Sequence, residues 1–288
     1  MGAAYNTGLS VAKGSYIHII DGDNYLDEDF LAVMLDSIKQ YDCDVAMCDY
    51  YLDRYAAGRY KRIGYLRYKP DFMPNKTELA RKAFDLYTAL ILQSPCNKLY
   101  RAEIIKNQRF DEDRAYTLVV DSDFNVRLLG KLNSAATLGK PLVHYVQYDP
   151  AFRKQITLNW QYRYDSSAVH CEVRMKRLFQ NYYRNTGGVF SDKLNIRLNN
   201  YFVGRFLKIA QILALDPLLS REAKLREFRR FKTVFQSVLK DGEATHPPYK
   251  ILTCLIQKEQ LKLLKLIYFS LGLCADYFPQ LIKMTKAR

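Results

Sequence analysis

The first half of the chain has short apolar runs that alternate with segments of helical spacing. Residues 16–20 form an apolar run, an acidic turn follows at 21–24, and residues 44–49 form a second apolar run. Between them, residues 27–40 carry apolar side chains on one helical face, namely Phe30, Leu31, Met34, Leu35 and Ile38. A strand, helix and strand in this order predict an α/β sheet that is mostly parallel and flanked by helices.

The rest of this half continues with less regular elements. Residues 50–75 are rich in Tyr, Arg, Gly and Pro, which predicts a long loop or hairpin beside a site. Helical spacing returns at 77–93 and at 121–129, separated by a break at 94–98 and a short helix from Arg101. Strands are expected near 134–137 and 142–148.

The second half predicts helices alone. Amphipathic patterns lie near 152–184, 190–215, 219–240 and 249–272, with breaks at Gly or Pro pairs between them. The pattern changes at Asp149-Pro150, so we expect an α/β domain over residues 1–150 and a basic helical domain over 151–288.

Charge divides the chain at the same place. Residues 1–150 hold 19 Lys and Arg against 20 Asp and Glu, whereas residues 151–288 hold 25 against 10. The excess of basic residues in the second half attracts anionic lipid, nucleic acid or phosphorylated ligands. Lys258, Lys262 and Lys265 recur along an apolar helical pattern, which fits a helix on an anionic membrane surface and equally a helix inside a bundle. The same choice applies to the aromatic and basic residues 228–232, where nucleic acid is the other reading.

The compartment is predicted from what the sequence does not contain. The six cysteines show no zinc or disulfide spacing, and the opening residues do not match a secretory signal, so we expect a cytoplasmic protein. Residues 251–273 are interrupted by charges and are too polar to span a membrane, although peripheral contact with its inner face remains open.

Three motifs carry candidate chemistry. The first comprises Gly2 to Leu9 with Asn6, then residues 12–17, then Asp21-Gly22-Asp23-Asn24. Two carboxylates one residue apart at a strand end can face one hard cation that bridges the phosphates of a nucleoside diphosphate. This run resembles the Ala-Arg-Asn-x-Gly, Ala-x-Gly-x-Tyr-Ile and Asp-x-Asp segments of family 2 glycosyltransferases, which have the GT-A fold.

The other two motifs extend the resemblance to about residue 150. Residues 95–101, with Asn97 and Lys98, are similar to the family's Asn-Lys-Leu-Tyr-Arg segment, and residues 110–125 look like its Phe-x-Glu and Glu-Asp segments. The resemblance places Asp121 on the catalytic base, Asp21 and Asp23 on the metal. It places Asn6, Asn97 and Lys98 on the substrate. Each also has a structural reading, since Asn97 and Asp121 could simply cap helices.

The resemblance implies an inverting glycosyltransferase. It would use Mg²⁺ or Mn²⁺ to move a sugar from a nucleotide-sugar, a UDP-sugar by expectation, to a glycan or lipid-linked acceptor in surface polysaccharide synthesis. The family's opening strands are not found before the first motif, which suggests an N-terminally truncated, incomplete GT-A domain. The alternative is therefore a catalytically inactive remnant or a membrane-associated subunit. We expect no nucleic-acid partner, and we expect His144 to be a packed residue outside the site.

Overall fold

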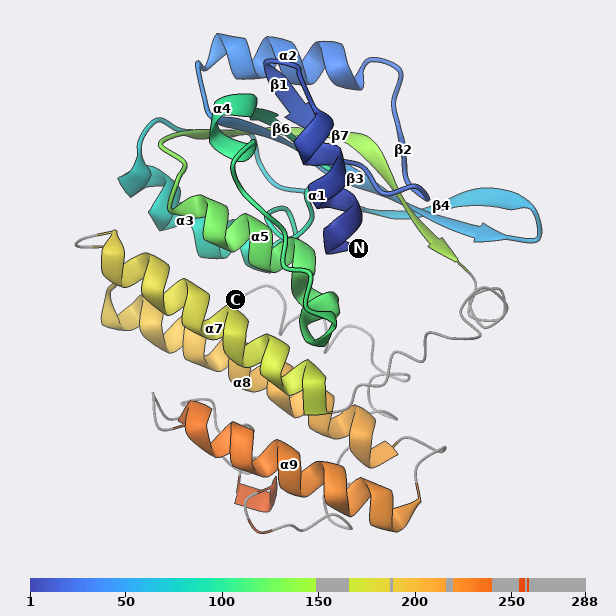
Figure 1. Cartoon of the computed structure of the whole chain (residues 1–288), viewed down its shortest axis with the longest axis vertical. Coiled ribbons are helices and arrows are strands. Elements are labelled where there is room, and N and C mark those ends of the chain that lie inside the picture. The colour runs from blue at the N-terminus through green and yellow to red at the C-terminus, as the bar shows by residue number, and fades with distance from the viewer. Residues whose placement is uncertain (149–165, 187–188, 216–219, 240–253, 257, 259–288) are drawn as a thin grey trace. The chain divides into compact units, whose positions relative to one another are not determined.

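The computed structural model describes residues 1–148, 166–186, 189–215, 220–239, 254–256 and 258, which fall into two compact units (Figure 1). Unit 1 comprises Met1–Tyr162 and Arg177–Ser191, and unit 2 comprises Arg163–Lys176 and Asp192–Arg288. The predicted junction at Asp149-Pro150 lies outside the described residues.

Unit 1 is built on one sheet. Its strands are ordered β1 (Tyr16–His18), β6 (Lys98–Arg101), β3 (Val45–Ala56), β7 (Ala135–Tyr148) and β2 (Tyr25–Leu26), while β4 (Arg59–Leu66) pairs with β3 and β5 (Asp71–Met73) pairs with β7.

The sheet is mixed, which corrects the expectation of mostly parallel strands. Among the described strands only β3 and β7 pair in parallel. Strands β1 and β3 run in the same direction, as their connection through α2 predicts, but β6 lies between them and is antiparallel to both. The α/β class is confirmed. The sheet contains both parallel and antiparallel strand pairs.

Helices cover this sheet on both faces. Figure 1 shows α2 (Phe30–Gln40) over one face, and α3 (Lys76–Thr88) and α5 (Val120–Leu129) on the other. Phe30, Met34 and Ile38 of α2 are fully buried against strand residues that include Ala46 and Leu99, because they lie at helical spacing. The remaining helical elements of this part are α1 (Gly2–Val11), α4 (Ala102–Ile105) and a 3-10 turn (Arg114–Val119).

Two predicted elements differ in extent. Residues 50–75 form a β-hairpin of β3 and β4 followed by β5, which confirms the hairpin alternative. The strands expected near 134–137 and 142–148 are one strand, β7, whose register against β3 shifts around Gly139. A bulge of this kind interrupts the pairing and gives the sequence the look of two strands.

Gly139 should be sensitive to substitution. Its φ is +66°, and a Cβ there would lie 2.6 Å from a Pro70 side-chain carbon. We expect Gly139→Ala to lower the free energy of unfolding by about 1–3 kcal/mol in urea denaturation. Gly8→Ala is the matched control, because Gly8 lies inside α1 with open space around its Cβ, and it should be neutral or stabilising by up to about 1 kcal/mol. Equal effects of the two changes would contradict this account.

The helical part contains α7 (Ser166–Asn185), α8 (Asp192–Leu215) and α9 (Arg221–Leu239). In unit 1, the end of α7 packs on α3: the backbone N–H of Phe84 donates to the Tyr183 hydroxyl at 3.1 Å, and Phe179 lies edge-on to Phe84. In unit 2, Arg205 forms an ion pair with Glu172 at 2.7 Å and Phe231 is fully buried. The helical character expected beyond residue 150 is confirmed where the chain is described.

The sequence bears on two kinds of membrane contact, a spanning helix and a helix on the membrane surface. Searching the helices placed in this structure yields none with the length and apolarity needed to cross a bilayer. Of the three lysines of the predicted membrane-surface helix, Lys262 and Lys265 lie outside the described residues, so that helix stays a prediction.

Candidate active site

The acidic turn after β1 is held by side chains from three segments. The Tyr5 hydroxyl of α1 donates a hydrogen bond to Asp21 Oδ1. On the other oxygen, Cys96 Sγ donates to Asp21 Oδ2 at 3.4 Å and Asn24 Nδ2 lies 3.5 Å from it. The Asp21 carboxylate is therefore fixed in direction, with one end towards α1 and the other towards the loop before β6.

Asp121 lies in the first turn of α5 and is brought close to Asp21. Burial and, next, the negative charge of Asp21 raise the pKa of the Asp121 carboxyl to about 7, against the opposing charge of Lys98. Its Oδ1 atom is buried and has no hydrogen-bond partner among the described residues. Two carboxylates 100 positions apart in the sequence thus share one electrostatic environment, and one of them keeps a free acceptor oxygen.

Asp23 has different neighbours from Asp21. Its side chain is exposed, and after burial its charge is the next cause that raises the pKa of Tyr148 at the end of β7. The Val146 N–H donates to Asn24 Oδ1 at 3.1 Å, which docks the turn on the same strand. No cluster of three or more His, Cys, Asp or Glu side chains suited to a metal occurs in the described part of the chain.

Asn6 acts as a clamp between α1 and the segment that leads to α5. Its Nδ2 donates to the Phe110 carbonyl at 3.0 Å and to Glu112 Oε1 at 2.8 Å, and its Oδ1 accepts from the Phe110 N–H at 2.8 Å. All polar atoms of this side chain are therefore engaged by the protein. The structure places Asn6 as a support of the site.

Asn97 and Lys98 are likewise buried and engaged. Asn97 Nδ2 donates to the Cys48 carbonyl at 2.7 Å, and Lys98 Nζ donates to the carbonyls of Ile91, at 2.7 Å, and Ser94. Burial lowers the pKa of Lys98 to about 7. Neither side chain is exposed to a ligand in this structure, but the charge of Lys98 reaches Asp121.

A pocket of about 520 Å³ opens between α1 and β1. Its polar lining includes Tyr5, His18 and Asp21, and the rest is mainly apolar. His18 Nδ1 contacts the Lys98 carbonyl at 2.8 Å, and burial lowers the pKa of the ring, so the imidazole is favoured in its neutral form. Its volume lies within the range of small-molecule sites, and Asp21 contributes a carboxylate to its lining.

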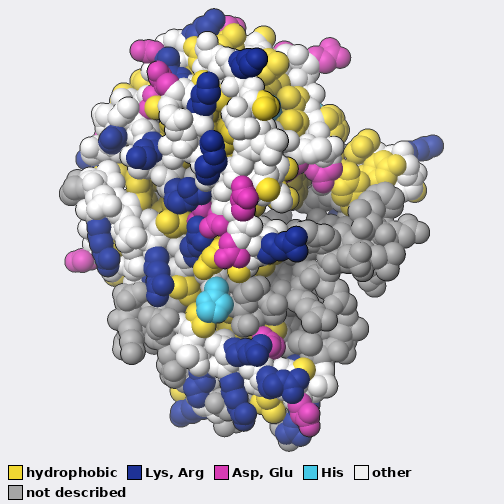
Figure 2. All heavy atoms as spheres, viewed as in Figure 1, with side chains coloured by type: hydrophobic (Ala, Val, Ile, Leu, Met, Phe, Trp, Pro, Cys, Tyr) yellow, Lys and Arg dark blue, Asp and Glu magenta, His cyan; other side chains and the backbone are white. Residues whose placement is uncertain are grey.

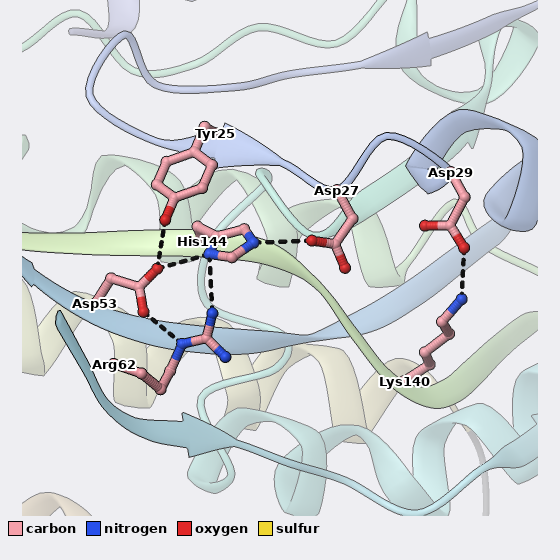
Figure 3. A network of polar contacts seen from close by, with 7 residues as sticks. All are labelled: Tyr25, Asp27, Asp29, Asp53, Arg62, Lys140 and His144. Carbon is pink, nitrogen blue, oxygen red and sulfur yellow. Dashed lines mark hydrogen bonds and ion pairs between the residues drawn. The ribbon is translucent and has the colours of Figure 1, made fainter. Parts of the chain in front are cut away.

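Some residues of the site carry no signal in the sequence. Tyr5 stands where the Ala-Arg-Asn segment has Arg, and neither it nor Cys96 had a predicted role, yet both bind Asp21. His144 is confirmed as a packed, hydrogen-bonded residue. Its two ring nitrogens contact Asp53 Oδ2 at 2.6 Å and Asp27 Oδ1 at 2.9 Å (Figure 3).

Figure 3 shows that this network, centred on the buried Asp53 and His144, also holds Tyr25 and Arg62. The Tyr25 hydroxyl donates to Asp53 Oδ2 at 2.6 Å, and Arg62 Nε donates to Asp53 Oδ1 at 2.5 Å. Burial opposes ionisation of Asp53, but these hydrogen bonds and that of His144 hold its pKa below the usual range. The network ties β2, β3, β4 and β7 together next to the acidic turn.

Comparison with known proteins finds similarity to glycosyltransferases. Residues 1–109 match the model of glycosyl transferase family 2. Glycosyltransferase GlyA of Streptococcus pneumoniae is 28% identical over 117 residues, which are 38% of this chain and 16% of GlyA. The uncharacterized glycosyltransferase EpsJ of Bacillus subtilis is 23% identical over 253 residues, 83% of this chain and 67% of EpsJ.

Solved structures agree in fold. The crystal structure of S. aureus TarS residues 1–349 in complex with UDP-GlcNAc has a TM-score of 0.61 and 14% identity, covering 94% of this chain and 72% of that one. The same fragment in complex with UDP has a TM-score of 0.58 and 15% identity, covering 93% and 71%. Residues 1–109 are thus similar to glycosyl transferase family 2, and the mixed sheet flanked by helices is of the GT-A-like type.

Proposed function

We propose that the protein is an inverting glycosyltransferase that moves a sugar from a UDP-sugar to a glycan or lipid-linked acceptor in surface polysaccharide synthesis. The observation that carries this proposal is the proximity of Asp121, with its unpartnered carboxylate oxygen, to Asp21, which lines a pocket. TarS, whose crystal structures contain UDP-GlcNAc or UDP, supports a UDP-sugar as the donor.

Asp121 has the properties of a general base. A base works best when its pKa lies near the working pH, because it is then ionised and still strong enough to accept a proton. The pKa of Asp121 is about 7, and its Oδ1 is free to accept the proton of an acceptor hydroxyl. In an inverting transfer the hydroxyl oxygen forms the new bond to the sugar carbon, its proton passes to Asp121, and the nucleoside diphosphate leaves.

The residues present fit a divalent cation. Mg²⁺ and Mn²⁺ prefer carboxylate oxygens and use one or two of them together with substrate phosphates. Asp21 supplies one such carboxylate, and a bound cation would relieve the repulsion between Asp21 and Asp121. Asp23 offers a second, exposed carboxylate in the same turn. A bound cation would neutralise the charge of the departing diphosphate.

Asn6, Asn97 and Lys98 then act as supports of the substrate site. Asn6 holds the segment before α5, and Asn97 with Lys98 holds the loop that carries Cys96 against Asp21. We further propose that the α/β part carries the donor site and that the basic helical part contributes contact with the inner face of a membrane. The competing proposal, an inactive remnant or membrane-associated subunit, is favoured if the pocket binds no nucleotide.

The direct test is catalytic. The full chain should release UDP from at least one member of a UDP-sugar panel in Mn²⁺ or Mg²⁺, and chelation with EDTA should stop this release. Absence of release with every donor, together with no calorimetric binding of UDP in metal, would favour the inactive remnant. Release that is unchanged in EDTA would remove the metal from the proposal.

Lys98 provides a finer prediction on the same site. Its positive charge lowers the pKa of Asp121, so Lys98→Met should move the acidic limb of the pH profile of kcat/KM to higher pH. The Arg101→Met variant serves as the control, because Arg101 pairs with Asp42 and the Cys43 carbonyl away from Asp121. Thermal unfolding must show both variants folded. An acidic limb that stays in place in Lys98→Met would contradict the assigned coupling.

A further inference from the structure

One face of the sheet beside the acidic turn is covered by tyrosine rings. The rings contact one another in pairs, with centroid distances of 5.6 Å for Tyr25 and Tyr60, 4.9 Å for Tyr55 and Tyr60, 5.8 Å for Tyr55 and Tyr148, and 5.6 Å for Tyr51 and Tyr65. We call these six residues the tyrosine face. They come from β2, β3 and β4, with Tyr148 at the end of β7.

Strand register explains why they gather. Side chains on a strand alternate between its faces, so Tyr51 and Tyr55 share a face. Their partners across the hairpin are Tyr65 and Tyr60, and Tyr55 is also opposite Tyr148 on β7. Between Leu52 and Asp53 the pairing with β4 shifts, because Ile63 is an extra residue, and this bulge brings both tyrosines of β4 to the same side.

The tyrosine face is exposed and held in place. Tyr60 is 56% exposed, Tyr65 46% and Tyr25 38%. The Arg62 guanidinium lies 3.7 Å from the centre of the Tyr51 ring, and Arg67 lies 4.3 Å from that of Tyr65. Figure 2 shows hydrophobic side chains, a class that includes tyrosine in that view, over the projecting hairpin. Exposed aromatic rings with fixed positions are typical of binding surfaces.

The hairpin that supplies these rings is strongly cationic. Residues 54–69 contain six Lys and Arg and no Asp or Glu. All six are exposed, and Arg62 also pairs with Asp53. Screening by salt becomes strong only beyond about 8 Å at physiological ionic strength, so these cations also act on a ligand on the other side of the hairpin. An anionic group on the tyrosine face therefore lies within the field of the hairpin.

The tyrosine face is continuous with the proposed site of transfer. Tyr25 follows the acidic turn after Asn24, and Asn24 is bonded to Val146 of β7 at 3.1 Å. Asp23 lies within electrostatic range of Tyr148. A chain molecule on the tyrosine face would thus reach the turn that holds Asp21.

We propose that the tyrosine face binds an anionic oligosaccharide, the acceptor of the transfer, with sugar rings stacked on tyrosine rings and its acidic groups near the hairpin cations. This inference rests on the proposed function for its place next to the donor site. A sugar ring presents a flat C–H face and polar edges, which matches aromatic rings that carry hydroxyl groups. The hairpin tip is Ala57-Gly58 followed by Arg59, which offers no large apolar side chain for insertion into a bilayer.

Binding of a defined probe tests this proposal without donor or turnover. The probe is hexagalacturonate, and its fully methyl-esterified form is the uncharged counterpart. The full chain should bind the charged probe by calorimetry at low salt and bind the ester more weakly. Combining Tyr60→Ala with Tyr65→Ala should weaken binding of the charged probe about 10-fold. Combining Arg59→Gln with Lys61→Gln should weaken the charged probe alone and reduce its dependence on salt.

Tyr145→Ala is the matched control. Tyr145 is on β7 next to His144, so it points to the opposite face of the same sheet, and it is 37% exposed. Binding should be unchanged in this variant. The proposal is overturned if Tyr145→Ala weakens binding as much as the double tyrosine variant does. It is also overturned if a uridine 12-mer or phosphatidylglycerol vesicles bind through the same tyrosines while hexagalacturonate does not. Loss of UDP release with retained probe binding would count against the proposed transfer alone.

Discussion

Asp121→Asn should lower kcat with the active UDP-sugar by about 10³-fold while the binding of UDP stays within about twofold, because general-base catalysis contributes roughly 10²–10⁴-fold. The amide keeps the size of the side chain but cannot accept the proton of the acceptor hydroxyl. Steady-state release of UDP in saturating acceptor measures kcat, and calorimetry measures UDP binding. Turnover within about tenfold of the unchanged protein would remove Asp121 from the role of base.

The same variant should be more stable than the unchanged protein at neutral and alkaline pH. The folded-state pKa of Asp121 is about 7, above the ordinary value of 3.8, so the folded protein binds more protons between these values. Stability therefore falls as pH rises from about 4 to 7. We expect Asp121→Asn to gain up to about 4 kcal/mol at pH 8 and nothing at pH 4, by urea denaturation at both values. A variant that is less stable at pH 8 would contradict the assigned burial.

The second large effect is expected at Asp53. This carboxylate is 2% exposed and is contacted by Tyr25, Arg62 and His144, so Asp53→Ala removes a buried acceptor that three side chains share. We expect a loss of about 3 kcal/mol in the free energy of unfolding at pH 7. Because the folded-state pKa of Asp53 is lowered, its contribution is present above the ordinary carboxyl range and is lost as pH falls below it.

The control for Asp53 is the ion pair of Asp29 and Lys140 in the same view (Figure 3). This pair is 2.6 Å apart and about half exposed on both sides. Lys140→Ala should change stability by no more than about 0.5 kcal/mol, since solvent screens exposed pairs. Equal losses in the two variants would show that burial of the network does not decide its contribution.

The expected elements of the fold follow from periodicity where it is strong. The helix with Phe30, Met34 and Ile38 and the apolar strand after it are found as the pattern predicts. The insertion of β6 between β1 and β3 could not be predicted, because the order of strands depends on long-range pairing that leaves no local signal. The sequence predicts two strands where the structure has β7 alone, because the irregularity around Gly139 interrupts the alternation of side chains.

The sequence predicts which residues belong to the candidate site, but it does not predict how their side chains are arranged. The motifs selected Asp21 and Asp121, and the structure brings these two close together. They did not indicate that Asn6, Asn97 and Lys98 bind the protein's own backbone, because an amide or ammonium group looks the same in sequence whether it faces a ligand or a carbonyl. The tyrosine face was hidden because the extra residue Ile63 breaks the period of two in β4.

Calorimetric titration of UDP into the full chain, in Mn²⁺ and again in EDTA, tests the central claim most directly, because it asks whether the carboxylate of Asp21 holds a cation for the diphosphate. We predict binding in Mn²⁺, its loss in EDTA, and a decrease in affinity of at least about tenfold in Asp21→Asn with metal present. UDP binding of equal strength with and without metal, or undiminished binding in Asp21→Asn, would contradict the account.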